Sequence, residues 1–313
     1  MPSDADRDLT SAERARLRAY RSAASLADLV AVTDTDSEHD AYFAAKRDYR
    51  DLTERAQTGP DAAGGLPGSR VAVDGNDFWV HGVTHADTDA EREFLQRHVS
   101  RLLDDGAAVY TEQGIRPMYF SSFHRVNEMD DYAWATDQCA DADCESYVDL
   151  PDAFDGVVED VNALAARFRD AAFGLIDAGG EFYGEHFEAA LGDVATDFLT
   201  SHEDVSTATD FASFQLSREA ARDPSKLDAL QAYYGRAFLP QPVEREWLRR
   251  HDPELELLTH GRNERLADYA VYHTERARDV HLVVGAAHQP GVTYYLEQHR
   301  DGERSVADFE LVR

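Results

Sequence analysis

The chain has 313 residues, and 43% of them are apolar, enough to bury a sizeable core in one large domain or two ordinary ones. Its 61 acidic side chains outnumber the 31 basic ones and give a formal charge of −30, which argues against nucleic acids and anionic membranes as partners, because both need clustered Lys and Arg. Lysine is confined to Lys46 and Lys226. So acidic a surface repels itself, and molar salt, in which the Debye length is about 3 Å, quenches that repulsion. We therefore expect a salt-adapted cytoplasmic protein.

Residues 1–69 are expected to form an N-terminal helical arm followed by a linker. The first residues lack the apolar core of a secretory signal, and no run of about 18 apolar residues indicates a transmembrane helix. Two helices and a Gly- and Pro-rich linker are expected in turn at residues 10–33, 37–57 and 58–69. Thr10 stands three residues before Glu13, which is capping-box spacing. The apolar stripe of the first helix suits either packing on the core or a homodimer, and it consists of Leu17, Tyr20, Ala24 and Ala27.

The main domain, residues 70–313, is expected to begin with a β-hairpin and a strand–helix–strand unit. Alternating apolar residues flank Asp74-Gly75-Asn76, which has the chemistry of a tight turn. The second strand runs into Gly82-Val83-Thr84-His85, a helix follows over about 88–105, and a short strand over 107–111 ends at Glu112. This succession predicts a βαβ unit with a parallel pair and a right-handed crossover.

A large helical insertion is expected over about 121–258, after which the chain returns to α/β structure. Helix boundaries are expected at Gly180, Pro224, Pro240 and Pro253. The remaining elements are expected to be a helix over 262–278, a buried strand over 281–284, a turn over 285–291, a short helix over 292–299 and a last strand over 304–312. The fold class is therefore α/β, with a mixed central sheet built from N- and C-terminal α/β pieces.

Three ionisable side chains follow three predicted strands. His85 lies three residues after Gly82, His288 lies three residues after Gly285, and Glu112 directly ends a strand. Because ligands bind beyond the carboxyl ends of strands in open α/β sheets, we expect these three side chains to share one site. Imidazole serves as a metal ligand or general base, and a carboxylate at a strand end is costly unless it is paired, solvated or metal-bound.

Each of these residues also has a purely structural interpretation. His85 could cap the following helix, and Glu112 could pair with Arg116 four residues on. Arg116 could instead orient a substrate carboxylate or oxyanion. Asn263 could cap its helix, with Glu264 in the first turn.

Other polar residues are set aside. Asp130-Asp131 and Asp141–Glu145 are expected to be solvated acidic surface, and Cys139 and Cys144 lack the spacing of a common zinc pair, although a disulfide between them stays open. The sequence contains no phosphate-binding loop, dinucleotide fingerprint or serine nucleophile elbow.

Three segments resemble the TraB/PrgY family, which is grouped with Tiki metalloproteases, GumN proteins, erythromycin esterases and haem-binding ChaN proteins. They are Phe78–Asp87, Tyr110–Arg116 and Arg262–Gly291, and together they touch residues 70–120 and 260–313. The shared pattern is an early Gly-x-x-His, a strand-end Glu with a nearby Arg, an Arg-Asn start to a late helix, and a late Gly-x-x-His. In two respects the chain departs from it: Arg116 lies one residue closer to Glu112 than is usual, and the C-terminal membrane helices of many TraB proteins are absent.

The resemblance implies an erythromycin esterase/ChaN-like fold in which one site is lined by His85, Glu112, Arg262, Asn263 and His288. In the Tiki branch such a site is similar to a divalent-metal hydrolase centre.

The first functional hypothesis is thus a metal-dependent hydrolase of peptides or esters, with Mn²⁺, Co²⁺ or Zn²⁺ on His85, Glu112 and His288 and with Arg262 or Arg116 stabilising negative charge. The alternatives are a non-catalytic regulatory protein that binds haem, metal or a peptide, and a protein that kept the fold and lost activity.

Overall fold

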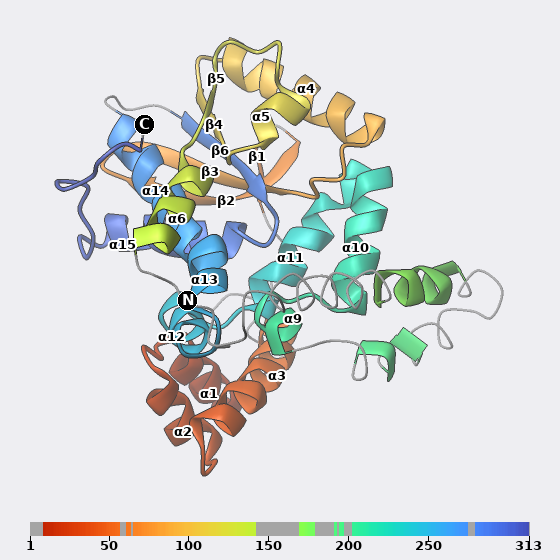
Figure 1. The fold of residues 1–313 in the computed structure, drawn as a ribbon, viewed down its shortest axis with the longest axis vertical. Coiled ribbons are helices and arrows are strands. Elements are labelled where there is room, and N and C mark those ends of the chain that lie inside the picture. Colours follow the sequence, from red (N-terminus) through yellow and green to blue (C-terminus); the bar gives the residue numbers. More distant parts are fainter. Residues whose placement is uncertain are drawn as a thin grey trace, which may run out of the picture.

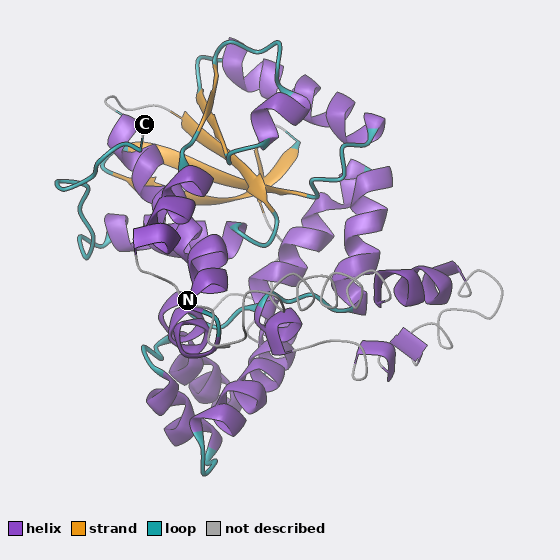
Figure 2. Ribbon diagram, in the orientation of Figure 1, coloured by secondary structure: helices purple, strands orange, loops and turns teal. Residues whose placement is uncertain are grey.

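The computed structural model describes residues 9–56, 61–63, 65–141, 169–178, 191–192, 194–196, 202–274 and 279–312, which form a mixed α/β fold (Figures 1 and 2). The strands are β1 (Asp61–Ala63), β2 (Leu66–Val73), β3 (Asn76–Val83), β4 (Ala108–Thr111), β5 (Val126–Glu128) and β6 (Asp279–Gly285), and their order in the sheet is β1-β2-β3-β6-β4-β5. The hairpin is confirmed, since β2 and β3 pair antiparallel around a turn at Asp74 and Gly75, both of which have positive φ.

The centre of the sheet joins the two distant parts of the chain. β6, from the C-terminal part, pairs in parallel with β3 on one side and with β4 on the other. Gly82 lies opposite Val284, and Thr111 lies opposite Val283. The predicted βαβ unit is therefore right in that β3 and β4 run parallel. The two strands are not neighbours, however, because β6 lies between them. The carboxyl ends of β3, β6 and β4 lie side by side.

Helices cover both faces of this sheet. The described helices are α1 (Ser11–Arg21), α2 (Leu26–Thr33), α3 (Glu38–Ala56), α4 (Asp89–Asp104), α5 (Ile115–Tyr119), α6 (Asp131–Asp141), α9 (His202–Ser206), α10 (Phe211–Arg222), η2 (Pro224–Lys226), α11 (Leu227–Ala237), α12 (Gln241–His251), α13 (Pro253–Glu256), η3 (Leu257–Gly261), α14 (Arg262–His273) and α15 (Gln289–Arg300), and residues 169–178 are helical too. Along β6, Leu282 and Val284 pack in a core with α14 and α15, whereas Val283 packs in a core with α4 and α5. This alternation is the two-residue period of a strand buried on both faces.

The N-terminal helices pack on the helical insertion. α1, α2 and α3 share one apolar core with Trp247 and Leu248 of α12. Within it, Lys46 Nζ lies 3.0 Å from the fully buried carboxylate of Glu244. The capping box at Thr10 is present, but the predicted helix over 10–33 is two helices, because Ser25 caps a second one.

Several predicted boundaries are wrong. The predicted linker over 58–69 contains β1 and the start of β2, α14 ends at His273, and α15 begins at Gln289. The described residues 304–312 form no strand; instead, Arg304 pairs with Asp268 and Arg265 stacks over Phe309, so side chains rather than backbone ladders anchor this segment.

Gly180, Cys144 and most of Asp141–Glu145 lie outside the described residues, while Cys139 lies in α6. Within the described part of the chain, no helix is long and apolar enough to cross a membrane.

Candidate functional site

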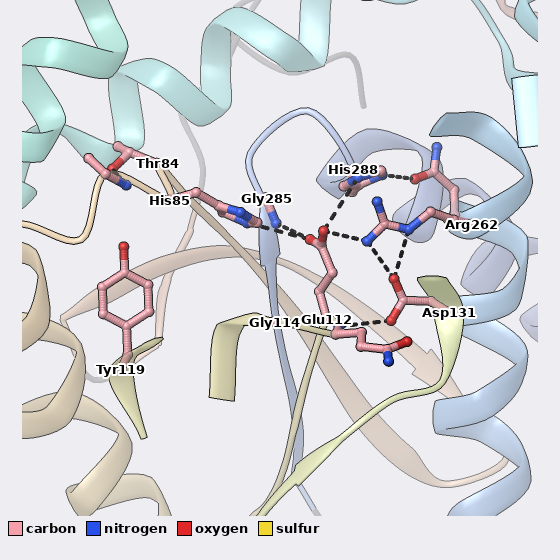
Figure 3. A network of polar contacts seen from close by, with 12 residues as sticks. Thr84, His85, Glu112, Gly114, Tyr119, Asp131, Arg262, Gly285 and His288 are labelled. Atoms are coloured by element: carbon pink, nitrogen blue, oxygen red, sulfur yellow. Dashed lines mark hydrogen bonds and ion pairs between the residues drawn. The ribbon is translucent and has the colours of Figure 1, made fainter. Parts of the chain in front are cut away.

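The two Gly-x-x-His segments meet at the carboxyl edge of the sheet. His85 follows β3, Glu112 follows β4, and His288 lies in the turn between β6 and α15. Because β6 lies between β3 and β4, the ends of these strands are neighbours. In Figure 3, the two imidazoles approach the Glu112 carboxylate from different sides.

The side chains of His85, Glu112 and His288 lie close together around Gly285. His85 Nε2 lies 3.6 Å from Glu112 Oε2, and His288 Nε2 lies 3.7 Å from Glu112 Oε1. A Cβ atom added to Gly285 would lie 3.1 Å from His85 Nε2, 3.4 Å from Glu112 Oε2 and 3.4 Å from His288 Cδ2. Glycine at position 285 therefore leaves room for these side chains to approach closely, and no unusual backbone angle is involved.

Glu112 is buried but remains an anion. Arg262 Nη2 donates to Oε1 at 2.6 Å, and the Gly285 N–H donates to Oε2 at 2.7 Å. Burial by itself would raise the pKa of the carboxyl group, but His288, His85 and Arg262 outweigh it and hold that pKa well below its usual range. The pairing of Glu112 with Arg116 considered from sequence is not formed.

A second carboxylate, Asp131 at the start of α6, stands behind Arg262. Arg262 Nε and Nη2 donate to Asp131 Oδ2 at 2.8 and 2.6 Å, and the Gln113 N–H donates to Oδ1 at 2.8 Å. Burial, reinforced by the charge of Glu112, raises the pKa of Asp131 to about 6 against the opposing effect of Arg262. The prediction that Asp131 is solvated surface is wrong, since the residue is fully buried. Its neighbour Asp130 pairs with Arg265.

His288 is held in one orientation and one tautomer. Its Nδ1 lies 2.7 Å from Asn263 Oδ1, and Asn263 Nδ2 donates to Gln241 Oε1 at 3.1 Å, which turns the Asn263 oxygen toward the imidazole. His288 Nδ1 is thereby the N–H donor, and Nε2 keeps its lone pair toward Glu112. Burial lowers the pKa of His288 to about 4, so the ring is neutral at pH 7. Asn263 does not cap α14, because the residue before that helix is Gly261.

His85 lies in a strained loop that is held in place by hydrogen bonds to Glu91. Its φ is +61°, which is rare for a non-glycine residue. The fully buried Glu91 of α4 accepts hydrogen bonds from Thr84 N and Oγ1, both at 2.8 Å, and from the hydroxyl of Tyr119, which itself accepts the Asp87 N–H at 3.1 Å. Burial opposes a charge on His85, but the adjacent Glu112 carboxylate outweighs it and raises the pKa of the ring. Thr88, not His85, caps α4.

The structure thus brings together five of the six residues singled out from sequence: His85, Glu112, Arg262, Asn263 and His288. Arg116 lies apart from them, and its Nε donates to the Val126 carbonyl at 2.9 Å. Sequence reasoning missed Asp131, Glu91 and Gln241. Of these, only Glu91 carried a local signal, because it stands three residues after the cap Thr88, where a carboxylate commonly reaches back toward the helix start.

The site opens on a cavity of about 330 Å³, lined also by Ser217, Tyr234 and Arg262. Across the described residues, no three His, Cys, Asp or Glu side chains already stand at metal-binding spacing. Four-coordinate ligation with bonds of about 2.0–2.1 Å puts neighbouring ligand atoms roughly 3.4 Å apart. The imidazole–carboxylate separations of 3.6 and 3.7 Å exceed this by a small margin, and the locked Nε2 lone pair of His288 is the form a metal requires.

No family model, curated protein or solved structure matches this chain.

Proposed function

We propose that the chain is a metal-dependent hydrolase of ester or peptide bonds, of the type found in the Tiki branch of the TraB/PrgY family, in a salt-adapted cytoplasm. The observation that carries the proposal is the convergence of His85, Glu112 and His288 on Gly285. Two nitrogen ligands and one oxygen ligand suit Mn²⁺, Co²⁺ or Zn²⁺, and do not choose among them.

The surrounding residues support this assignment by their chemistry. A bound divalent ion would act as a Lewis acid and lower the pKa of a coordinated water. Glu112 is kept anionic by Arg262, and His288 is kept neutral by burial and oriented by Asn263. Such outer contacts orient ligands in metal sites and raise their basicity.

Arg262 is assigned the role of electrostatic stabiliser. It lines the cavity and carries a full charge, because Asp131 and Glu112 more than offset the effect of burial on its pKa. A substrate carbonyl in the cavity would develop negative charge during hydrolysis, and a fixed cation beside it lowers the energy of that charge. Arg116, bonded to a backbone carbonyl away from the cavity, is given no role.

The test measures metal content and hydrolysis together, on protein purified in molar KCl. Wild type, stripped with chelator and reloaded with Mn²⁺, Co²⁺ or Zn²⁺, is assayed on a panel of p-nitrophenyl esters and fluorogenic peptides. His85→Ala and His288→Ala should lose metal and activity while keeping the far-ultraviolet circular dichroism spectrum, and Arg116→Ala, the control from the same segment as Glu112, should keep both. Full metal occupancy and activity in His85→Ala would refute the assignment. A Soret shift on adding haemin, without hydrolysis, would support the binding protein instead.

A further inference from the structure

A second cavity adjoins the candidate metal site. It has a volume of about 310 Å³ and lies between α10 and the helical segment 169–178. Thr84, Ser217 and Tyr234 line both this cavity and the one that holds His85 and His288. The two cavities are therefore adjacent, and a substrate that reaches past Thr84, Ser217 and Tyr234 would occupy both.

The lining of the second cavity sets two phenylalanine rings among small and polar side chains, which include Thr209, Ser213 and Asp170. Phe173 and Phe214 line it with ring centroids 5.6 Å apart, and Ala221 closes one side. Its charged side chains are paired: Arg169 pairs with Asp170 of the lining and with Asp204, and Arg218 Nη1 lies 2.7 Å from Asp177 Oδ2.

The positive charges that line this cavity are therefore balanced by carboxylates of the protein itself. The Arg218 guanidinium also lies over the Phe214 ring, 5.4 Å from its centroid. An anionic ligand would have to displace Asp204 or Asp177 from these arginines, and a cationic one would have to displace Arg169 from Asp170. An uncharged apolar group needs no such exchange, and aromatic walls favour aromatic or branched aliphatic groups.

We propose that this cavity is the specificity subsite of the enzyme, and that the substrate is an ester or amide carrying a neutral aromatic or branched apolar group next to the bond that is cleaved. The inference rests on the proposed hydrolase function for the cleavage, but the binding of the apolar group stands apart from it. High salt, in which this acidic protein is expected to work, strengthens such apolar burial.

Two measurements separate the subsite from the chemistry. Binding of the uncharged, fluorescent probe naphthalene-1-acetamide is followed by fluorescence titration in molar KCl, which needs neither metal nor turnover. Ester hydrolysis is followed as the ratio of kcat/KM for p-nitrophenyl phenylacetate to that for p-nitrophenyl acetate.

Two variants act on the cavity in opposite ways. Ala221→Leu fills it, and Phe214→Ala removes an aromatic wall; both leave the metal-site residues in place. Either variant should weaken probe binding by about tenfold or more and lower the phenylacetate-to-acetate ratio by a similar factor, while acetate hydrolysis stays near the wild-type rate. Arg116→Ala should change neither quantity.

The outcomes are distinguishable. If both variants weaken probe binding but the protein hydrolyses nothing, the hydrolase proposal is wrong and the apolar pocket is supported. Wild-type probe affinity in both folded variants, or no binding by wild type, would overturn the subsite even if ester hydrolysis is found.

Discussion

Glu91 offers the sharpest mutational test of how the fold holds His85. Its carboxylate is fully buried and accepts three hydrogen bonds, two from Thr84 and one from Tyr119, below the loop in which His85 has a φ of +61°. In Glu91→Ala these three donors lose their acceptor. A buried donor without a partner costs about 1–3 kcal/mol, and partial relaxation of the loop recovers some of the sum, so we expect a loss of about 3 kcal/mol in the free energy of unfolding.

Glu91→Gln is the graded comparison. The amide can keep its oxygen toward Thr84 while its NH₂ group donates to the Tyr119 hydroxyl, so the cost should be about 1–2 kcal/mol. A non-glycine residue in the left-handed region costs about 1–3 kcal/mol and persists only when its surroundings enforce it. Loosening that enforcement should displace His85 and weaken Mn²⁺ binding by about 10- to 100-fold, the usual effect of losing an outer support of a metal ligand.

The assay pairs urea unfolding in molar KCl with isothermal titration of Mn²⁺. Tyr119→Phe is the matched control, because it removes one of the three donors and leaves Glu91 in place; it should lie between wild type and Glu91→Ala in both measurements. If Glu91→Ala unfolds at the wild-type urea concentration and binds Mn²⁺ as wild type does, Glu91 does not position His85.

Two further predictions concern Gly285 and the buried histidine pair of the sheet. Gly285→Ala places a Cβ 3.1 Å from His85 Nε2 and should lower Mn²⁺ affinity by about tenfold or more with the fold intact, whereas Gly174→Ala, whose Cβ meets only an Arg218 nitrogen at 3.9 Å, should not; equal affinities in the two variants would contradict the crowding at Gly285. His81 and His281, joined by a ring-to-ring hydrogen bond of 2.8 Å, have pKa values that burial lowers to about 3 and about 4, below the 6.5 of a free histidine. The unfolded chain thus takes up protons first, so stability should be complete above about pH 6.5 and fall as the pH drops from there toward 4, by at most about 2.7 kcal/mol per pH unit for two protons. The double variant His81→Gln/His281→Gln should show a shallower fall in urea titrations across that range, and an unchanged slope would disprove the pair's contribution.

The sequence was informative wherever a local pattern decided the structure. The turn at Asp74-Gly75, the cap at Thr10 and the buried β6 follow from neighbouring residues alone, and the rule for strand ends in α/β sheets was enough to place His85, Glu112 and His288 together.

The rest depended on contacts between distant segments. The insertion of β6 between β3 and β4 is a choice among sheet orders that periodicity does not rank. Asp131 sits in an acidic stretch that is typical of surface, and its burial follows only from where Arg262, 131 residues later, meets it. Residues 304–312 have apolar residues at strand-like spacing, but Arg304 and Phe309 dock on α14 side chains instead of adding a strand.

The most direct measurement is an anomalous difference map from a crystal grown in high salt and soaked in Mn²⁺, with data collected on both sides of the manganese edge. We predict one strong peak within bonding distance of His85 Nε2, His288 Nε2 and a Glu112 oxygen, and its loss in His85→Ala. Rings that point away from one another, or a peak elsewhere with none beside Glu112, would contradict the account.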